Sequence, residues 1–129
     1  MAVPKELVLY YNPNPSGHVA RMKGVFVQMG IRIKNVTSEE VGYTVGCLAG
    51  IKEADKEVQA NCPEISDEML VMKGFSSQRV DQLLLALRKA KVPKINLKAV
   101  VTDSNRNWSF YKLYEEIKKE HEEMSNETS

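Results

Sequence analysis

The sequence has little net charge, little cysteine and no long apolar run. Its 18 Lys and Arg residues nearly balance its 17 Asp and Glu residues, so no net field attracts a phosphate backbone. No apolar run approaches the ~20 residues that a bilayer crossing needs, and residues 1–6 lack the pattern of a signal peptide. These absences predict a cytoplasmic protein that binds neither nucleic acid nor a membrane.

The side chains that hold metals and cofactors are also scarce. Cys47 and Cys62 are not in a C-x-x-C arrangement, and they are predicted to be free thiols. His18 and His121 lie far from each other and from the cysteines, so no metal-ligand spacing occurs. Neither a Walker loop nor a G-x-G-x-x-G motif is present. We therefore expect no metal and no cofactor.

The apolar residues recur in patterns typical of alternating strands and helices. Residues 6–11 and 69–72 form continuous apolar runs, as buried strands do. Spacings of three and four predict helices in between. The expected strands are residues 6–11, 31–36, 69–72 and 97–102, and the expected helices cover 19–29, 37–48, 77–90 and 107–124. Residues 51–67 are polar and are predicted to be an insert or a connection. The chain is predicted to form a single domain over residues 1–124, followed by a disordered tail over residues 125–129.

Four strands, each followed by a helix, predict an α/β fold. With right-handed crossovers, this order gives a three-layer α/β/α sandwich around a mainly parallel four-stranded sheet. We expect the strand order 2-1-3-4, with the apolar first and third strands at the centre. The alternative is a thioredoxin-like fold, which requires an antiparallel hairpin in the second half and normally a cysteine in the 12–18 loop, where none occurs.

In a doubly wound sheet, ligands bind at the carboxyl ends of the strands. The loops after the strands are therefore the candidates, and those after the first and third strands should meet at the switch point. Ser76 also reads as a helix N-cap, and Asn107 as the cap of the last helix, with Trp108 packed onto the core. The candidate ligand-binding residues in these loops are Ser16, His18, Ser76, Ser77, Arg79, Asp103, Asn105, Asn107 and Trp108.

Three functions fit these residues. The first is a non-enzymatic module that binds a small anionic or planar ligand, or a protein partner, through these loops. The second is a small hydrolase or phosphoryl-transfer enzyme acting through His18, Ser76 and Asp103. The third is a homodimer or subunit whose contact surface includes the side formed by Gly42, Gly46 and Gly50.

The second half of the chain also resembles a known family. Residues 68–76, 84–90 and 98–108, including Asn107-Trp108, are similar to an uncharacterised bacterial domain family known chiefly from clostridial and related gut bacteria. The resemblance is strongest over residues 68–108 and looser over the first half. It implies a small bacterial cytoplasmic protein and directs attention to the 74–77 and 102–108 loops, without implying an activity.

Overall fold

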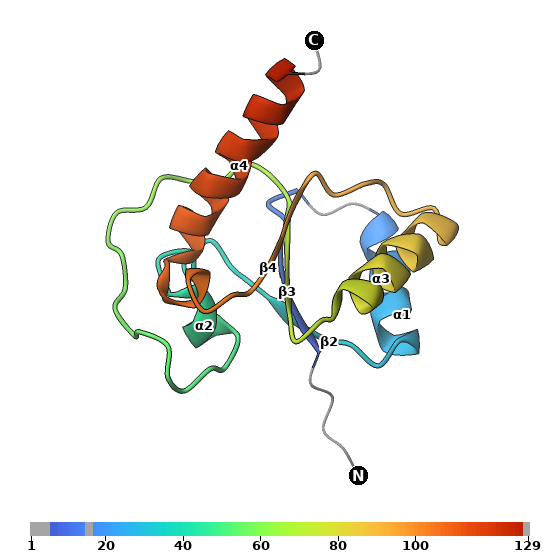
Figure 1. Cartoon of the computed structure of the whole chain (residues 1–129), viewed down its shortest axis with the longest axis horizontal. Helices are drawn as coiled ribbons and strands as arrows, with labels where there is room; N and C mark the ends of the chain where they lie inside the picture. Colours follow the sequence, from blue (N-terminus) through green and yellow to red (C-terminus); the bar gives the residue numbers. More distant parts are fainter. Residues whose placement is uncertain (1–5, 15–16, 128–129) are drawn as a thin grey trace.

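A computed structural model of the protein describes residues 6–14 and 17–127 (Figure 1). Strands and helices alternate along these residues, which confirms the predicted mixed α/β class. The elements are β1 (Leu7–Tyr11), α1 (His18–Gln28), β2 (Arg32–Asn35), α2 (Val45–Leu48), β3 (Met69–Lys73), α3 (Ser77–Lys89), β4 (Leu97–Val100), the 3-10 helix η1 (Asn105–Asn107) and α4 (Phe110–Glu127).

The four strands form one sheet in the predicted order, β2-β1-β3-β4. β1 pairs with β2 in parallel, and β3 pairs with β4 in parallel. The central pair, β1 and β3, is antiparallel, with Leu9 opposite Val71. The sheet is therefore mostly parallel, but the expectation that all the carboxyl ends share one edge is wrong. The ends of β1 and β2 lie at one edge, and those of β3 and β4 at the opposite edge.

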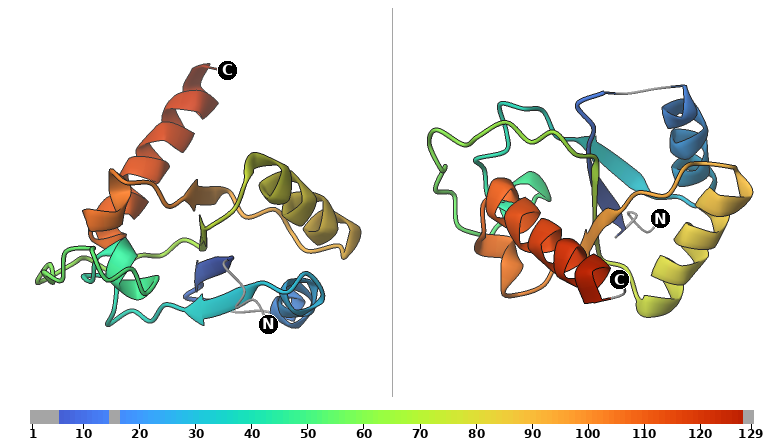
Figure 2. Two further views of the ribbon diagram at one scale, coloured as in Figure 1. Left: turned by 60° about the horizontal axis from the view of Figure 1, so that its bottom comes forward. Right: turned by 90° about the horizontal axis from the view of Figure 1, so that it is seen from above.

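The two faces of the sheet carry separate apolar clusters, because successive side chains of a strand point to opposite faces. Val8 and Tyr10 of β1 pack with residues of α1 and α3. Leu9 and Tyr11 pack with residues of α2 and α4. Figures 1 and 2 show α1 and α3 side by side on one face, and α2 with the start of α4 on the other. Burial on both faces explains why β1 and β3 read as continuous apolar runs.

The polar segment of residues 51–67 contains no helix or strand and packs against α2 and the start of α4. Ala54 and Ile65 anchor it in the core, with exposed fractions of 5% and 1%. The Ile65 carbonyl also accepts a hydrogen bond from the Tyr11 hydroxyl at 2.8 Å. The segment is thus fixed to the domain by its few apolar residues.

Glycines in and before α2 allow this segment to approach closely. A Cβ added to Gly42 would lie 2.3 Å from the Gln59 carbonyl oxygen, and one added to Gly46 would lie 2.4 Å from the Ala54 Cβ. Two of the three glycines expected on a partner-binding side therefore pack inside the chain.

The second helix is shorter than predicted. The prediction covered residues 37–48, whereas α2 comprises only Val45–Leu48, with the Thr44 side chain as its N-cap. Glu40 does accept hydrogen bonds from the backbone N–H and hydroxyl of Thr37, as a capping box would. Here that pattern closes an isolated turn, because no helix follows it directly.

The last helix differs from the prediction at both ends. Its first residue is Phe110, and the Ser109 hydroxyl accepts from the Lys112 N–H at 2.9 Å, so Ser109 and not Asn107 is the cap. At the other end α4 continues to Glu127, beyond the predicted end at residue 124. Residues 128 and 129 lie outside the described residues.

A thioredoxin-like arrangement does not fit the second half. That fold would place an antiparallel hairpin there, whereas β3 and β4 are parallel and are joined by α3. The thioredoxin-like alternative is therefore wrong.

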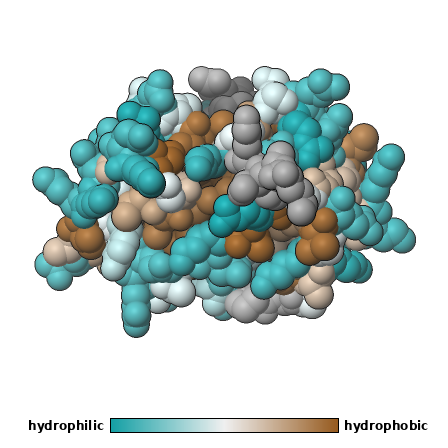
Figure 3. Space-filling model, turned by 90° about the horizontal axis from the view of Figure 1, so that it is seen from below, coloured by the Kyte–Doolittle hydropathy of each residue, from teal (hydrophilic) through white to brown (hydrophobic). Residues whose placement is uncertain are grey.

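The exposed apolar side chains are distributed over several elements of the described structure. Figure 3 shows one face, on which hydrophilic side chains form most of the periphery and apolar ones appear in patches between them. Within the described residues, no helix has the length and hydrophobicity to cross a membrane. The most exposed large apolar side chains are Val27, Tyr43, Val58, Leu85 and Val100, which belong to five different segments.

Candidate functional site

The predicted ligand-binding loops do not converge. His18 begins α1, at the edge where β1 ends, whereas Ser76 and Asp103 follow β3 and β4 at the opposite edge. Ser16 lies outside the described residues. The antiparallel β1–β3 pair thus separates the residues of the proposed hydrolase or phosphoryl-transfer site, and no switch point forms between the first and third loops.

The residues at the start of α3 perform structural roles. The Ser76 hydroxyl accepts from the Arg79 N–H at 3.2 Å, and Ser77 is the first helical residue. The Arg79 guanidinium donates to both Glu6 carboxylate oxygens, at 2.7 and 2.6 Å, and to the Met29 carbonyl at 3.1 Å. The hydrogen bond from Arg79 holds the pKa of Glu6 below its usual range. The ion pair between Arg79 and Glu6 connects the residue before β1 to α3, and the guanidinium is occupied by these contacts within the chain.

The loop of residues 102–108 is also held by internal contacts. Buried Asn105 accepts from the Thr102 N–H at 2.8 Å and donates to the Val100 carbonyl at 3.0 Å. Asn107 accepts from the Asp55 N–H at 2.9 Å, which ties the loop to the 51–67 segment. Asp103 is exposed, and its carboxylate lies 3.7 Å from the Arg106 guanidinium.

Trp108 packs against the apolar cluster on the α2 and α4 face, as predicted for a residue before the last helix. The Lys112 ammonium lies 4.8 Å from the centre of its ring. Trp108 therefore presents its ring to a cation of the following helix, α4.

Two polar clusters lie where β1 ends and β3 begins. The Tyr10 hydroxyl and the Asn12 amide both donate to the Glu68 carboxylate. The Tyr114 hydroxyl donates to Asp67 at 2.7 Å, and the Lys118 ammonium lies 3.3 Å from the same carboxylate. Burial, and then the contact with Glu68, raises the pKa of Tyr10. The hydrogen bond from Tyr114 lowers the pKa of Asp67. Each carboxylate is already satisfied by donors of this chain.

No metal or thiol chemistry emerges from the described residues. Among them, no group of three or more His, Cys, Asp or Glu side chains could hold a metal ion. Cys47 and Cys62 are both free, as predicted. Burial raises the pKa of the Cys62 thiol, which disfavours the reactive thiolate.

The strongest candidate site is a cavity of about 220 Å³ between α3 and the segment that leads from α3 into β4. Its wall is mainly aliphatic. Three basic side chains, Arg88, Lys94 and Lys98, complete the lining, and none of the lining residues is acidic. The aliphatic part comprises Leu70, Leu84, Leu87, Val92, Pro93 and Ile95.

The sequence forms this cavity through an arched connection. Pro93 cannot continue α3, and Lys91 turns the backbone at a φ of 61°. Val92 and Ile95 then insert into the core, with exposed fractions of 8% and 4%, while Lys94 is exposed. Val92 and Ile95 therefore fix the connection to the core, and the cavity lies between this connection and α3.

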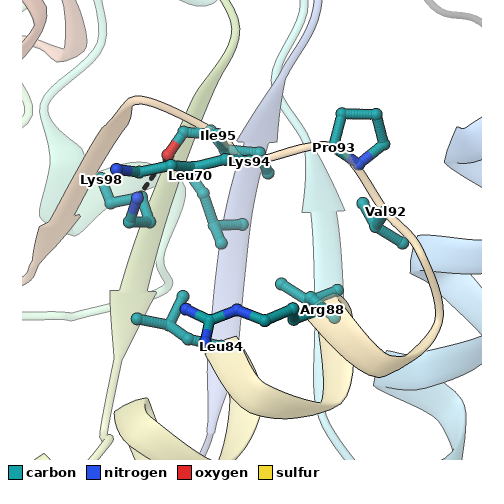
Figure 4. A pocket seen from close by; sticks show the side chains of 9 residues that line it. Leu70, Leu84, Arg88, Val92, Pro93, Lys94, Ile95 and Lys98 are labelled. Carbon is teal, nitrogen blue, oxygen red and sulfur yellow. Dashed lines mark hydrogen bonds between the residues drawn. The ribbon is translucent and has the colours of Figure 1, made fainter.

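The basic side chains surround the mouth of the cavity. In Figure 4, Lys94 and Lys98 run along one side of it, and Arg88 lies across from them on α3. The Lys98 ammonium donates to the Ile95 carbonyl. Burial, reinforced by the nearby charge of Lys94, lowers the pKa of Lys98. Within the described part of the chain, none of these three cations forms an ion pair. The cavity therefore joins an apolar interior to a basic rim whose three cations have no carboxylate within ion-pair distance among the described residues. Carboxylates lie further away, since Lys94 also lines a neighbouring cavity with Asp67, Glu68 and Glu122.

Comparison with known families concerns the half of the chain that contains this cavity. Residues 68–124 match DUF3783. The family is described as a domain of unknown function. The DUF3783 segment includes every residue that lines the cavity. Comparisons with curated proteins and with solved structures find no match. The predicted resemblance is thus confirmed only as a match to a domain of unknown function.

The sequence pattern does not predict this cavity within the DUF3783 segment. Residues 92–96 are expected only as the connection between the third helix and the fourth strand, and Arg88, Lys94 and Lys98 are not among the predicted site residues. The available signal was the alternation of apolar Val92, Ile95 and Leu97 with basic residues, and the absence of any acid over residues 82–102. Such a pattern indicates a positive surface patch, although it does not predict a cavity.

Proposed function

We propose that this protein is a non-enzymatic binding module for a small anion with an apolar body, held in the cavity between α3 and residues 92–96. The single observation that supports it is the combination of an aliphatic wall with three unpaired cations at the mouth. An apolar group would displace water from the wall. Its anionic end would receive charge-assisted hydrogen bonds from Lys94, Lys98 or Arg88.

The size of the cavity limits the ligand. A dry cavity of about 150 Å³ holds benzene, so about 220 Å³ accommodates a single ring or a chain of roughly six to eight carbons. The proposed ligand class is therefore a monocarboxylate or a monophosphate ester with one small apolar group. A larger planar ligand such as a nucleotide would extend beyond this volume.

The electrostatics favour an anion over a neutral ligand. Burial, and then the charge of Lys94, lowers the pKa of Lys98, and its ammonium has no counter-ion within ion-pair distance among the described residues. An anion beside it would supply that counter-ion and raise this pKa again.

The test is calorimetric titration of the whole chain with hexanoate, octanoate and benzoate, each paired with its neutral alcohol. We expect the anions to bind at least tenfold more tightly than the alcohols. At about 100 times its Kd a ligand adds ~2.7 kcal/mol of stability, which raises the midpoint of thermal unfolding by about 10 °C. Equal binding of acids and alcohols, or no binding of either, would contradict the proposal.

A variant that fills the cavity provides a steric control. Leu84 is half-buried and lines the wall, so Leu84→Trp should abolish anion binding. Leu85→Trp is its matched control, because Leu85 is the neighbouring, exposed residue of α3 and does not line the cavity. Unchanged anion binding by Leu84→Trp would place the ligand elsewhere.

A further inference from the structure

The two halves of the chain have the same order of strands and α-helices, with η1 as an additional turn in the second half, and they share backbone hydrogen bonds at equivalent positions. The first helix of each half, α1 or α3, is followed by a residue with a positive φ, which is Gly30 at 71° after α1 and Lys91 at 61° after α3. The next residue then donates back into the helix. The Ile31 N–H donates to the Phe26 carbonyl at 2.8 Å, and the Val92 N–H to the Leu87 carbonyl at 3.0 Å. The helices α1 and α3 thus end in the same way.

The exits from β2 and β4 also correspond. The Val36 N–H donates to the Tyr10 carbonyl at 2.8 Å, and the Val101 N–H to the Met72 carbonyl at 2.9 Å. A turn closed by a side chain follows in both halves. Glu40 accepts from the Thr37 N–H at 3.0 Å, and Asn105 accepts from the Thr102 N–H at 2.8 Å.

The caps of α2 and α4 complete the correspondence. The Thr44 hydroxyl accepts from the Cys47 N–H at 3.1 Å, and the Ser109 hydroxyl accepts from the Lys112 N–H at 2.9 Å. In both halves the cap therefore stands seven residues after the threonine that opens the preceding turn.

The two halves meet through reciprocal contacts. In the centre of the sheet Leu9 lies opposite Val71, which are corresponding residues of β1 and β3. The two caps form a second bridge, Thr44 opposite Ser109. There the Val45 N–H donates to the Trp108 carbonyl at 2.8 Å, and the Phe110 N–H donates to the Tyr43 carbonyl, also at 2.8 Å. Contacts in which each residue faces its own counterpart are those of a twofold axis.

We infer that the chain consists of two copies of one β-α-β-α unit, residues 6–50 and 68–115, paired across a pseudo-twofold axis through a self-complementary surface. The DUF3783 match covers the second unit, so the partner that this surface fits is another copy of the same unit. In this chain the first unit takes that place, and residues 51–67 connect the two.

Divergence explains why the repeat is not visible in the sequence. Few corresponding positions keep the same residue, and the units differ where the proposed ligand site lies. The connection between the helix and the second strand is residues 29–31 in the first unit and 90–96 in the second. The cavity-forming arch is therefore a property of the second unit. Identical corresponding residues are Glu6 and Glu68, Val19 and Val80, Val36 and Val101, Thr37 and Thr102, and Leu48 and Leu113.

An exchange of corresponding core residues tests the inference in the full chain. Val45 and Phe110 correspond and are both fully buried beside the axis. We expect Val45→Phe and Phe110→Val each to lower the midpoint of thermal unfolding by at least about 5 °C. The double variant V45F/F110V should recover at least half of the summed loss, because it moves the ring to the equivalent place.

A double variant of identical composition is the control. Val41 is buried in the same cluster, but its counterpart is Arg106, so V41F/F110V should not recover. Equal midpoints of thermal unfolding for the two double variants would overturn the inference. It would also be overturned if V45F/F110V lowered the midpoint by as much as the two single substitutions do together.

The self-complementary surface has its own test. The test chain replaces residues 6–50 with a second copy of residues 68–115 and keeps 51–67 as the connection. That copy carries Asn107→Gly and Tyr111→Gly, because the equivalent positions, Gly42 and Gly46, leave no room for a Cβ against residues 51–67. The two units are otherwise the same. We expect this chain to be a monomer by light scattering and to unfold in one cooperative thermal transition. The claim would be overturned if this chain lacked a cooperative transition, or if its units paired only with units of other molecules.

Discussion

Replacing Lys98 with methionine separates ligand binding from stability. Methionine keeps the length and most of the apolar surface of the side chain but removes its charge. In the folded protein Lys98 donates to the Ile95 carbonyl and lies half-buried near Lys94, across the cavity from Arg88. Lys98→Met thus removes one hydrogen bond and one poorly solvated cation.

The two effects on stability have opposite signs. Loss of the hydrogen bond costs about 0.5–1.5 kcal/mol, whereas removal of a desolvated, unpaired cation stabilises the fold. We therefore expect the free energy of unfolding at pH 7 to change by less than about 1 kcal/mol. The affinity for octanoate should fall roughly 10- to 100-fold, since a hydrogen bond to a charged group contributes about 1.5–3 kcal/mol.

The pH dependence of the free energy of unfolding provides a second test with the same variant. Because the pKa of Lys98 is lower in the folded than in the unfolded chain, the unfolded chain binds more protons between the two values. The stability of the wild type therefore rises as pH increases through this window, and Lys98→Met should lack that rise.

Urea unfolding from pH 7 to 10.5 measures this stability, and calorimetry measures the affinity. The exposed Lys119→Met is the matched control, because Lys119 lies on α4. A Lys98→Met protein that binds octanoate as tightly as the wild type would refute the assignment of Lys98 to the site. A destabilisation above about 2 kcal/mol would refute the view that its charge is poorly compensated.

Three further predictions concern the scaffold. The carboxylate of Glu6 has a lowered pKa in the folded chain, so its contribution to stability is complete above its unfolded pKa and is lost as pH falls through the folded one. Glu6→Gln should flatten the urea-unfolding stability curve below roughly pH 5, and a curve parallel to the wild type would count against the Arg79 contact. Gly46→Ala should destabilise by about 1–3 kcal/mol in the same assay, because the added Cβ would lie 2.4 Å from that of Ala54. Gly24→Ala should instead stabilise by up to ~1 kcal/mol, since a Cβ there meets nothing within 4 Å; a loss of stability would show that α1 is constrained there.

Local patterns in the sequence predicted most elements and their order in the sheet. The apolar runs of β1 and β3 indicated central strands, and the spacing of Leu83 and Leu87 indicated α3, because each depends on burial within one segment. The strand directions could not be predicted in the same way. Nothing in residues 51–67 indicates whether β3 runs with or against β1, and that one direction decides which loops share an edge.

The same limitation applies to the predicted ligand-binding residues. Ser76 and Asn105 are candidates because they are polar residues in loops, but loop polarity does not distinguish a ligand contact from a backbone cap. Both side chains satisfy the backbone of their own loops. The cavity depends on residues of α3 and β4 being brought together under an arch, which no periodicity of a single segment encodes. The reciprocal contacts of Thr44 and Ser109 likewise became visible only in three dimensions.

Amide chemical-shift mapping with octanoate tests the proposed binding site most directly. The assigned, nitrogen-15-labelled chain would be titrated with octanoate and, separately, with octanol. The account predicts saturable shifts concentrated in residues 84–98, present with octanoate and at least tenfold weaker with octanol. Saturable shifts confined to other residues, or no shifts at millimolar octanoate, would contradict it.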